Sequence, residues 1–517
     1  MAKKKYILVN DLGTTGNKAV IVDDQLNIVA SEGGHYETYY PHPNWATQRI
    51  SEVEGVLLKN VKDVIAKSLI DPKEIVVASF SNQMMTMVPV DKEGNVLTDE
   101  VGIWCDMRQN EQAERLMKAL GGNDEYYRIT GIGWPPALAP ICKIMWYKDN
   151  LPDIYQKTYK FLQYKELIVN RWAGIFATEH GDMSMNGMMD CTRREISPLI
   201  FETAEVDVNK IPDVRNPDDV IGYITREAAA KTGLAEGTPI TLGSGDVICA
   251  NTGAGIIKEG MAYTYIGSAN WSGIFRENPS LDPKYKMTCN TMQPQGGYQL
   301  EMTTSAGGIA QDWFKNAIYT ANENVPGSNI YDKMRVDAAS IPAGANGLIF
   351  LPYIRGGGAP HFDINARGAF LGLGMAHDRR HMLRALYEGI CFNMRWLYDL
   401  YEELNIPIFS LDEIRAIGGG ALNDLWMQIY ADVNGVKFSR VASSQQMTAL
   451  GAAIMGGIGV GIWHDYEEAT DLIKVEKTFV PDPKKHEVYN ALYPIYRSAY
   501  SGLKDLYKSL TGYVENS

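Results

Sequence analysis

Two aspartates follow short apolar runs and adjoin glycines, a pattern that places a carboxylate at the end of a β-strand. The first, Asp11, ends the run that starts at Tyr6 and is followed by the turn 12–16, Leu-Gly-Thr-Thr-Gly. Backbone N–H groups in such a turn can bind phosphate oxygens, and the aspartate can hold Mg²⁺ through water. Asp, Gly and Thr are also common turn formers, so this motif alone leaves an ordinary hairpin turn open.

The second carboxylate, Asp246, follows the glycines Gly243 and Gly245. A carboxylate presented in this way can take the proton from a substrate hydroxyl as that hydroxyl attacks a phosphoryl group, and it can also bind a metal ion. The alternative is a helix N-cap, because the residues from Val247 to Gly253 can begin a helix.

Glycine-rich turns recur in the second half of the chain. Residues 267–270, Gly-Ser-Ala-Asn, separate two apolar runs as residues 12–16 do, which indicates a second phosphate-binding turn. Residues 418–421, Gly-Gly-Gly-Ala, would let a flat ring approach the backbone, and the alternative is a tight crossing from a strand to a helix. The sequence has no GxxxxGK[ST] phosphate loop, so any nucleotide site must be of another kind.

The elements that must position these residues form a repeated pattern. Strands are predicted over 6–11 and 18–23, joined by the first turn, and over 261–266 and 271–275, joined by the second. Two such hairpins predict two similar α/β halves that face a cleft, with the boundary near residues 250–260. Apolar spacing predicts helices over 53–68, 111–120, 381–404 and 425–433, and a close-packed Ala- and Gly-rich helix over 448–458.

The composition excludes several classes of protein. The 517 residues suffice for more than one core, and 49 Lys and Arg against 62 Asp and Glu give a net charge of −13. This charge argues against a non-specific nucleic-acid binder and a basic membrane-surface protein. The six cysteines never form a CxxC pair, so neither a zinc ribbon nor a disulfide framework is predicted. No stretch approaches the roughly 20 apolar residues of a membrane helix, and we expect a cytoplasmic protein.

Taken in order, these segments resemble the FGGY family of carbohydrate kinases over nearly the whole chain. The long stretch from 368 to 388 is specific to that family, and within it the chain is most similar to the xylulose kinases. Besides the two aspartate segments, the matching stretches are 82–85 (Asn-Gln-Met-Met), 103–108 (Ile-Trp-Cys-Asp-Met-Arg), 143–146 (Lys-Ile-Met-Trp), 368–373 (Gly-Ala-Phe-Leu-Gly-Leu), 381–388, 418–421 and 449–452.

The resemblance implies an α/β fold of two ribonuclease-H-like domains of the actin and hexokinase type with a cleft between them. Residues 1–255 would form the sugar-binding and catalytic domain, and residues 256–517 the domain that mainly binds ATP. The implied reaction transfers the γ-phosphoryl group of ATP, with Mg²⁺, to a hydroxyl of a small sugar, most simply a ketopentose such as xylulose. This chemistry needs in-line positioning, charge neutralisation and a base at the attacking hydroxyl. Its partners would be the sugar and ATP, and a homodimer is compatible with it.

The resemblance also implies roles for individual residues. Asp246 would be the general base and, with Asp11, would bind Mg²⁺. The acceptor would contact Gln83, Met84, Met85, Trp104, Asp106, Asp246 and Val247. The nucleotide and its phosphates would contact Thr14, Thr15, Lys18, Gly267, Ser268, Gly307, Gln311, Gly419, Gly420, Ala421 and Asn423.

Two segments depart from the family pattern, and each has an apolar side chain, Met85 or Val247, where the family has a polar one. Xylulose kinases usually have Gln-Met-His-Gly where this chain has Gln-Met-Met-Thr at 83–86. Glycerol kinases have an Arg-Glu pair in that segment, and its absence argues against a glycerol kinase. The residue after the catalytic aspartate is commonly Asn or Gln, but here it is Val247, as in the autoinducer-2 kinases. An apolar wall discriminates weakly among substrates.

Several readings of the acceptor follow from these departures. Further candidates for the apolar wall are Trp134, Met183 and Met185, although Met and Trp are more often plain core residues. The acceptor alternatives are another small polyol, a sugar acid, or a dihydroxy-dione of the autoinducer-2 type. A different class, the nucleotide-switch ATPase of the actin or chaperone type, shares the ATP cleft but has no acceptor. A dinucleotide-dependent oxidoreductase is disfavoured, because no GxGxxG follows the first strand.

Overall fold

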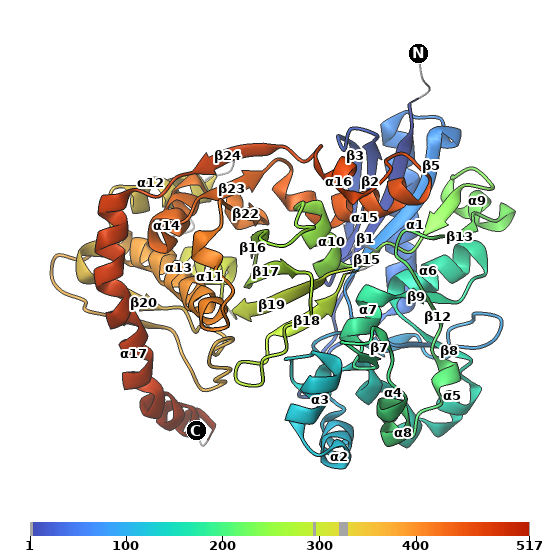
Figure 1. Cartoon of the computed structure of the whole chain (residues 1–517), viewed down its shortest axis with the longest axis horizontal. Helices are drawn as coiled ribbons and strands as arrows, with labels where there is room; N and C mark the ends of the chain where they lie inside the picture. The colour runs from blue at the N-terminus through green and yellow to red at the C-terminus, as the bar shows by residue number, and fades with distance from the viewer. Residues whose placement is uncertain (1–3, 293–295, 305, 320–328, 516–517) are drawn as a thin grey trace. The chain divides into compact units, whose positions relative to one another are not determined.

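The computed structural model describes residues 4–292, 296–304, 306–319 and 329–515, and it divides into two compact units (Figure 1). Unit 1 consists of Met1–Glu259, Phe275–Leu300 and Gln446–Ile473. Unit 2 consists of Gly260–Ile274, Glu301–Gln445 and Lys474–Ser517. The chain therefore crosses between the units more than once, and two segments from its second half belong to unit 1.

Unit 1 is built on a sheet with the strand order β13-β14-β5-β1-β2-β3, in which β15 also pairs with β5. β1 and β2 are antiparallel, whereas β1 and β5 are parallel. The predicted hairpin that carries Asp11 is thereby confirmed. The strands are β1 (Tyr6–Leu12), β2 (Gly16–Asp23), β3 (Ile28–His35), β5 (Ile75–Asn82), β13 (Val220–Tyr223), β14 (Pro239–Thr241) and β15 (Ser244–Gly245).

Helices bury both the hairpin and the strand beside it. α1 (Ile50–Ser68) packs on β2 and β3, and α15 (Met447–Gly459) packs on β1, on β5 and on α10 (Asp246–Gly253). Glycine allows the approach of α15 to α10, because a Cβ at Gly451 would lie 1.9 Å from the carbonyl oxygen of Cys249. The prediction of a close-packed helix over 448–458 is confirmed.

Unit 1 also contains short strand pairs and further helices. Short two-stranded pairings join β4 (Thr47–Arg49) to β7 (Glu100–Gly102), β6 (Val88–Val90) to β8 (Lys160–Leu162), β12 (Asp213–Arg215) to β9 (Ala177–Glu179), and β10 (Met189–Asp190) to β11 (Glu195–Ile196). The helices are α2 (Asn110–Leu120), α3 (Asn123–Thr130), α4 (Pro140–Asn150), α5 (Pro152–Lys157), α6 (Tyr164–Ala173), α7 (His180–Met185), α8 (Pro198–Ala204), α9 (Arg226–Thr232) and α16 (Tyr466–Thr470).

The second large sheet repeats the arrangement of the first. Its order is β18-β19-β17-β16-β22-β23-β24, and β16 is antiparallel to β17 and parallel to β22, as β1 is to β2 and β5. The prediction of a duplicated hairpin is therefore confirmed. The strands are β16 (Ala262–Ile266), β17 (Asn270–Arg276), β18 (Thr288–Thr291), β19 (Tyr298–Thr304), β22 (Ile414–Ile417), β23 (Phe438–Val441) and β24 (Val475–Phe479).

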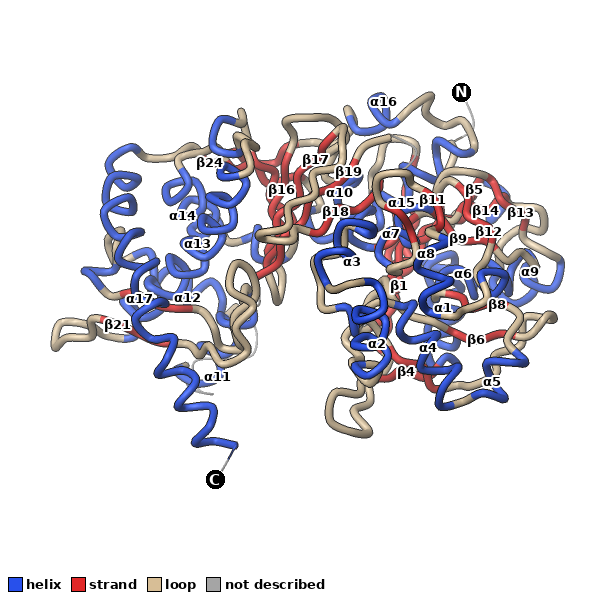
Figure 2. The backbone as a smooth tube through the Cα atoms, turned by 60° about the horizontal axis from the view of Figure 1, so that its bottom comes forward, coloured by secondary structure: helices blue, strands red, loops and turns tan. Residues whose placement is uncertain are grey.

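The helices of unit 2 gather into one group, which Figure 2 shows around α13 and α14. The helices predicted over 381–404 and 425–433 are confirmed as α13 (Arg379–Glu403) and α14 (Asp424–Asn434). Asp378 begins α13, because its side chain accepts the backbone N–H groups of Arg380 and His381. The other elements are α11 (Gly308–Ile318), α12 (Ile330–Ala339), α17 (Pro483–Glu515) and the strand pair β20 (Ile349–Leu351) and β21 (Ala369–Leu371).

All six cysteines lie in the described residues and are free, five of them buried and Cys105 partly exposed. This agrees with the expectation of scattered thiols without a disulfide framework. Within the described ranges, no helix is long and apolar enough to cross a membrane.

Candidate active site

Asp11 lies near the end of β1, half-buried, where another helix contributes to its surroundings. Its Oδ2 accepts a hydrogen bond from the hydroxyl of Thr448, at 2.7 Å, near the start of α15. Lys18 is opposite Asp11 in the antiparallel register, so the two side chains leave the same face of the sheet. A carboxylate, a hydroxyl and an ammonium group therefore share one edge of unit 1.

The turn after Asp11 is held by side chains from three other segments. The Tyr36 hydroxyl donates to the carbonyl oxygen of Gly13, and Gln48 Nε2 donates to that of Thr14 at 2.6 Å. Trp104 Nε1 donates to Thr14 Oγ1 at 3.0 Å. Burial, with a smaller contribution from Asp11, raises the pKa of Tyr36, so its hydroxyl remains a donor. The turn is thus braced, while Thr15 at its tip is exposed.

Asp246 reaches the same edge of the sheet from the other side of β5. Ser244 and Asp11 both lie opposite Ser81 in parallel pairings, so β15 and β1 flank β5, each about 4.8 Å away. The carboxyl ends of parallel strands are where ligands bind in open α/β sheets. The two aspartates singled out from the sequence therefore share this edge of unit 1.

The conformation around Asp246 depends on its glycines. Gly243 has a φ of 59°, and a Cβ there would lie 1.8 Å from the carbonyl oxygen of Phe80. Gly245 is the N-cap of α10, and Asp246 is the first residue of that helix rather than its cap. The N–H of Val247 donates to Asp246 Oδ1 at 2.9 Å and so orients the carboxylate.

Most of the predicted apolar wall comes together beside Asp246. Met84, Met85 and Met185 are buried as one cluster, and the partly buried Trp104, Trp134 and Val247 pack against it. We call these six residues the methionine cluster. Met183 is not among them, because it packs into a separate core with residues of α2 and α4.

A buried lysine ties together the two segments that carry Met85 and Trp104. Lys143 Nζ donates to the carbonyl oxygen of Met85 at 2.8 Å and also to that of Ile103. Met85 has a positive φ of 66°, a conformation that costs energy in a residue with a side chain. Burial lowers the pKa of Lys143 to about 8. The lysine thus stabilises a strained backbone at the methionine cluster.

Two polar residues that were expected to contact the acceptor form hydrogen bonds with other residues of unit 1. Gln83 is 1% exposed and donates through Nε2 to Gln48 Oε1 at 2.9 Å. Asp106 is fully buried, and its carboxylate accepts the N–H of Ala46 at 2.8 Å and the side chain of Arg108 at 2.7 Å. These contacts join neighbouring loops, and a direct contact of either residue with an acceptor stays a prediction.

In unit 2 the turn 267–269 packs against the start of α11. The N–H of Gly308 donates to the carbonyl oxygen of Gly267 at 2.6 Å, and that of Ile309 to the carbonyl oxygen of Ser268 at 3.2 Å. Gly307 is required here, because a Cβ would lie 2.1 Å from Asn270 Oδ1. The structure therefore brings Gly267, Ser268 and Gly307 together, and the buried Gln311 follows in the first turn of α11.

The glycines 418–420 lie at the end of β22, next to the end of β16. Gly418 has a φ of 89°, and a Cβ at Gly420 would lie 2.2 Å from the side chain of Ile266. Asn423 caps α14 by accepting the N–H of Trp426 at 3.2 Å. Ala421 is fully buried, whereas Gly419 is exposed. The two segments predicted to bind the nucleotide, 267–270 and 418–421, are therefore neighbours within unit 2. Residues 418–421 form the tight crossing from a strand to a helix that the sequence left open.

The carboxylate of Asp11 is compatible with bound Mg²⁺. Within the described ranges, no group of three or more His, Cys, Asp or Glu side chains could hold a metal ion. Mg²⁺ does not need such a group, because it keeps several waters and usually takes one or two carboxylates together with substrate phosphates. The carboxylate of Asp11 beside the hydroxyl of Thr448 fits that kind of binding.

Comparison with known proteins identifies the family of this chain. Residues 6–253 match the N-terminal domain of the FGGY family of carbohydrate kinases, and residues 266–460 match its C-terminal domain. The chain belongs to the FGGY family of carbohydrate kinases. It is an ATP-dependent carbohydrate kinase, with the family's two-domain, ribonuclease-H-like fold. This membership sets aside the nucleotide-switch and oxidoreductase alternatives.

Relatives of this FGGY kinase differ in the substrate that their names give. A xylulose kinase from Bacillus subtilis is 29% identical over 99% of this chain and 100% of its own length. A gluconokinase from Bacillus licheniformis is 26% identical, covering 98% of each chain. The crystal structure of a xylulose kinase from Lactobacillus acidophilus has a TM-score of 0.88 and 26% identity, covering 98% of this chain and 100% of that one. The family is therefore established, while the acceptor sugar is not.

Sequence reasoning missed the residues that support this FGGY kinase site from a distance. Thr448 lies 437 residues from Asp11, and no local pattern links the two. Gln48 stands in an ordinary polar context before α1, so nothing marked it as a brace. Lys143 lies within a stretch that matches the family, but a lysine within an apolar helix is itself a signal of a buried contact.

Proposed function

We propose that the acceptor of this ATP-dependent carbohydrate kinase is a small ketose such as the ketopentose xylulose, with Asp246 as the general base. The observation that carries the proposal is the placement of Asp246 and Asp11 at one sheet edge, on either side of β5. Full-length similarity to xylulose kinases supports the choice of sugar.

Asp246 would act at the hydroxyl that attacks ATP. Its carboxylate takes the proton as the hydroxyl oxygen bonds to the γ-phosphorus, and the bond from that phosphorus to the β,γ-bridging oxygen breaks to release ADP. The N–H of Val247 orients the carboxylate, so little reorganisation is needed when the proton moves.

Asp11 and Lys18 would bind the phosphate end of the nucleotide in unit 1. Asp11, held by Thr448, would bind Mg²⁺, which supplies charge neutralisation on the phosphates when it is bound. Thr14 and Thr15 lie in the braced turn beside it, where N–H and hydroxyl groups can donate to phosphate oxygens.

Unit 2 carries the other segments that we assign to the nucleotide. We assign the phosphates to Gly267, Ser268 and Gly307, and the adenosine to the segment 419–423, where the exposed Gly419 leaves the backbone accessible. This follows the expected division of labour, with catalysis and acceptor in residues 1–255 and mainly ATP in residues 256–517. Both the boundary and the individual contacts are part of the proposal.

A second candidate is an acceptor with fewer hydroxyls, such as a deoxy-ketose or a dihydroxy-dione of the autoinducer-2 type. The methionine cluster favours it, because apolar side chains next to Asp246 offer no hydrogen bonds to additional hydroxyls. A sugar acid is favoured less, since the nearby cations Arg108 and Lys143 are engaged by Asp106 and by backbone carbonyls.

The test is release of ADP in a coupled assay with xylulose, ribulose, 1-deoxyxylulose, a dihydroxy-dione, gluconate and glycerol. We expect the highest kcat/KM with xylulose or, if the second candidate is right, with the deoxy-ketose or the dione. Highest efficiency with gluconate or glycerol would contradict both candidates.

A further inference from the structure

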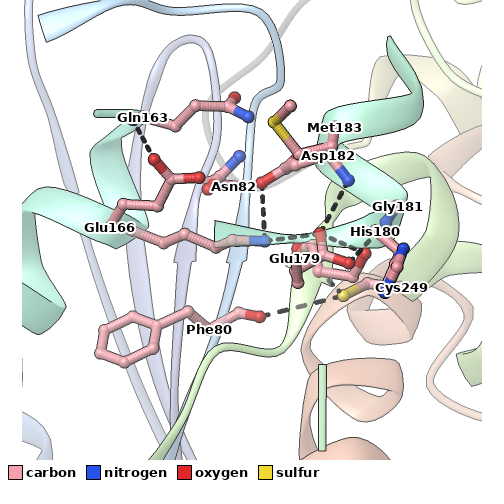
Figure 3. A network of polar contacts seen from close by, with 12 residues as sticks. Phe80, Asn82, Gln163, Glu166, Glu179, His180, Gly181, Asp182, Met183 and Cys249 are labelled. Atoms are coloured by element: carbon pink, nitrogen blue, oxygen red, sulfur yellow. Dashed lines mark hydrogen bonds and ion pairs between the residues drawn. The ribbon is translucent and has the colours of Figure 1, made fainter. Parts of the chain in front are cut away.

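A cluster of charged side chains from α6, β9 and α7 is buried within unit 1 (Figure 3). Lys165 of α6 has its ammonium 2.9 Å from Glu179 Oε1 and 2.6 Å from Asp182 Oδ2. The three side chains are at most 1% exposed. Burial opposes the charge of Lys165, but the two carboxylates outweigh this effect and raise its pKa, so the lysine is charged.

The cluster touches both residues that precede Asp246. The hydroxyl of Ser244 donates to Glu179 Oε1 at 2.9 Å. At Gly245 a Cβ would lie only 2.7 Å from Asp182 Oδ1, so this carboxylate packs directly on the glycine. The same Cβ would lie 2.5 Å from the Met84 side chain, on which Gly245 also packs. The backbone just before Asp246 thus packs both on the charged cluster of Lys165, Glu179 and Asp182 and on the methionine cluster.

Glu179 also fixes the start of α7. One of its oxygens accepts the N–H of Asp182 at 2.8 Å, and the other accepts that of Gly181 at 2.6 Å. The position of Asp182 is therefore coupled to that of Glu179 through both the ion pairs and the helix cap. Because a fully enclosed group of three charges binds no ligand and is a weak source of stability, its contacts with Ser244 and Gly245 call for another explanation.

We propose that Lys165, Glu179 and Asp182 are positioning residues that hold the backbone of Ser244 and Gly245 so that the Asp246 carboxylate reaches the acceptor hydroxyl. The inference rests on the proposed role of Asp246 as the general base. None of the three touches the reacting atoms, and their effect passes through the two residues before the base.

The charge of the cluster depends on pH through Asp182. Its neighbours are Lys165 and Glu166 from α6, Glu179 from the end of β9 and Asn82 from β5. Burial raises the pKa of Asp182 to about 6, and Lys165 opposes this rise. Burial also raises the pKa of Glu166 to about 8, which leaves that side chain protonated at neutral pH. On acidification Asp182 becomes neutral, and its ion pair with Lys165 is lost.

The test compares Ser244→Ala and Asp182→Asn with the wild type over pH 5 to 8. Removing the Ser244 hydroxyl deletes one hydrogen bond to the strand, and we expect kcat to fall roughly 10- to 100-fold with an unchanged KM for ATP, since misplaced catalytic groups cost about this much. Asp182→Asn should lower kcat similarly at pH 8 and should abolish the decrease in kcat that we expect for the wild type near pH 6.

Glu166→Gln is the matched control, because Glu166 is already protonated and a glutamine can still accept the N–H of Gln163 that it binds at 2.8 Å. Its kcat at pH 7 should equal that of the wild type. If Ser244→Ala and Asp182→Asn both keep a normal kcat while Asp246→Asn is inactive, the positioning role is wrong but the proposed function stands. Near-normal kcat in Asp246→Asn would overturn the proposed function instead. If Asp182→Asn does not fold, Ser244→Ala and the wild-type pH profile decide.

Discussion

The two hairpins of this FGGY kinase have the same strand arrangement but carry different groups. The β1–β2 hairpin holds Asp11 opposite Lys18, whereas the β16–β17 hairpin holds Tyr265 opposite Trp271, with their rings stacked at 3.6 Å. Side chains brace the first turn, and the backbone N–H groups of α11 bind the carbonyl oxygens of the second. The same strand arrangement thus carries charged side chains in unit 1 and a glycine-rich backbone in unit 2.

This difference predicts that changes in unit 1 act on kcat and changes in unit 2 on nucleotide binding. Among the residues of the two hairpins, the largest effect is expected for Asp11→Ala, which removes the carboxylate proposed to bind Mg²⁺. We expect kcat to fall roughly 10²- to 10³-fold, as when one electrostatic stabiliser is removed. Titration of activity with Mg²⁺ checks this, and an unchanged Mg²⁺ requirement would contradict the assignment.

Gly307→Ala tests the backbone site of unit 2. Its Cβ would lie 2.1 Å from Asn270 Oδ1 and 2.7 Å from the Gly267 carbonyl oxygen, so the turn must move away from α11. The KM for ATP should rise by roughly tenfold, about 1.4 kcal/mol of lost binding, while the KM for the acceptor stays the same. Gly502→Ala is the control, because nothing lies within 4 Å of a Cβ there.

Val247→Asn tests the methionine cluster. An asparagine next to Asp246 would supply a hydrogen bond to a further hydroxyl, so the ratio of kcat/KM for xylulose to that for 1-deoxyxylulose should rise. One added hydrogen bond corresponds to roughly 1 kcal/mol, or about fivefold. Met183→Leu is the control outside the cluster. An unchanged ratio would mean that Val247 does not line the acceptor site.

The smallest effect is on stability and concerns Glu166. Because burial raises its pKa from 4.5 to about 8, the folded chain keeps a proton that the unfolded chain has released between these values. The free energy of unfolding should therefore decrease as the pH rises through this range. Glu166→Gln should lose that part of the pH dependence and exceed the wild type in stability at pH 9 in urea titrations. Parallel curves for the two proteins would contradict the buried, protonated state.

Much of this organisation was predictable from local patterns. The alternation of apolar runs with glycine turns located both hairpins, and Asp11 and Asp246 were candidates because each carboxylate lies beside glycines where an apolar run ends. The methionine cluster was largely predicted from residue types, yet Met183 belongs to another core, because residues two positions apart on a helix, such as Met183 and Met185, face different directions.

The supporting contacts were not predictable, since they join distant parts of the chain. The bond from Thr448 to Asp11 depends on how α15 packs on β1, and the cluster at Lys165 depends on three separate elements. Sequence patterns report which residues are buried but not which buried charges meet. The same holds for Asp106, since the sequence does not show that its carboxylate binds Ala46 and Arg108 in the fold.

The central claim is that Asp246 is the base, and Asp246→Asn tests it most directly. The amide keeps the size of the side chain but cannot take a proton, so kcat with the best acceptor should fall by roughly 10³-fold or more. ATP binding, measured by calorimetry on the same sample, should be unchanged. A variant that retains near-normal kcat would contradict the account.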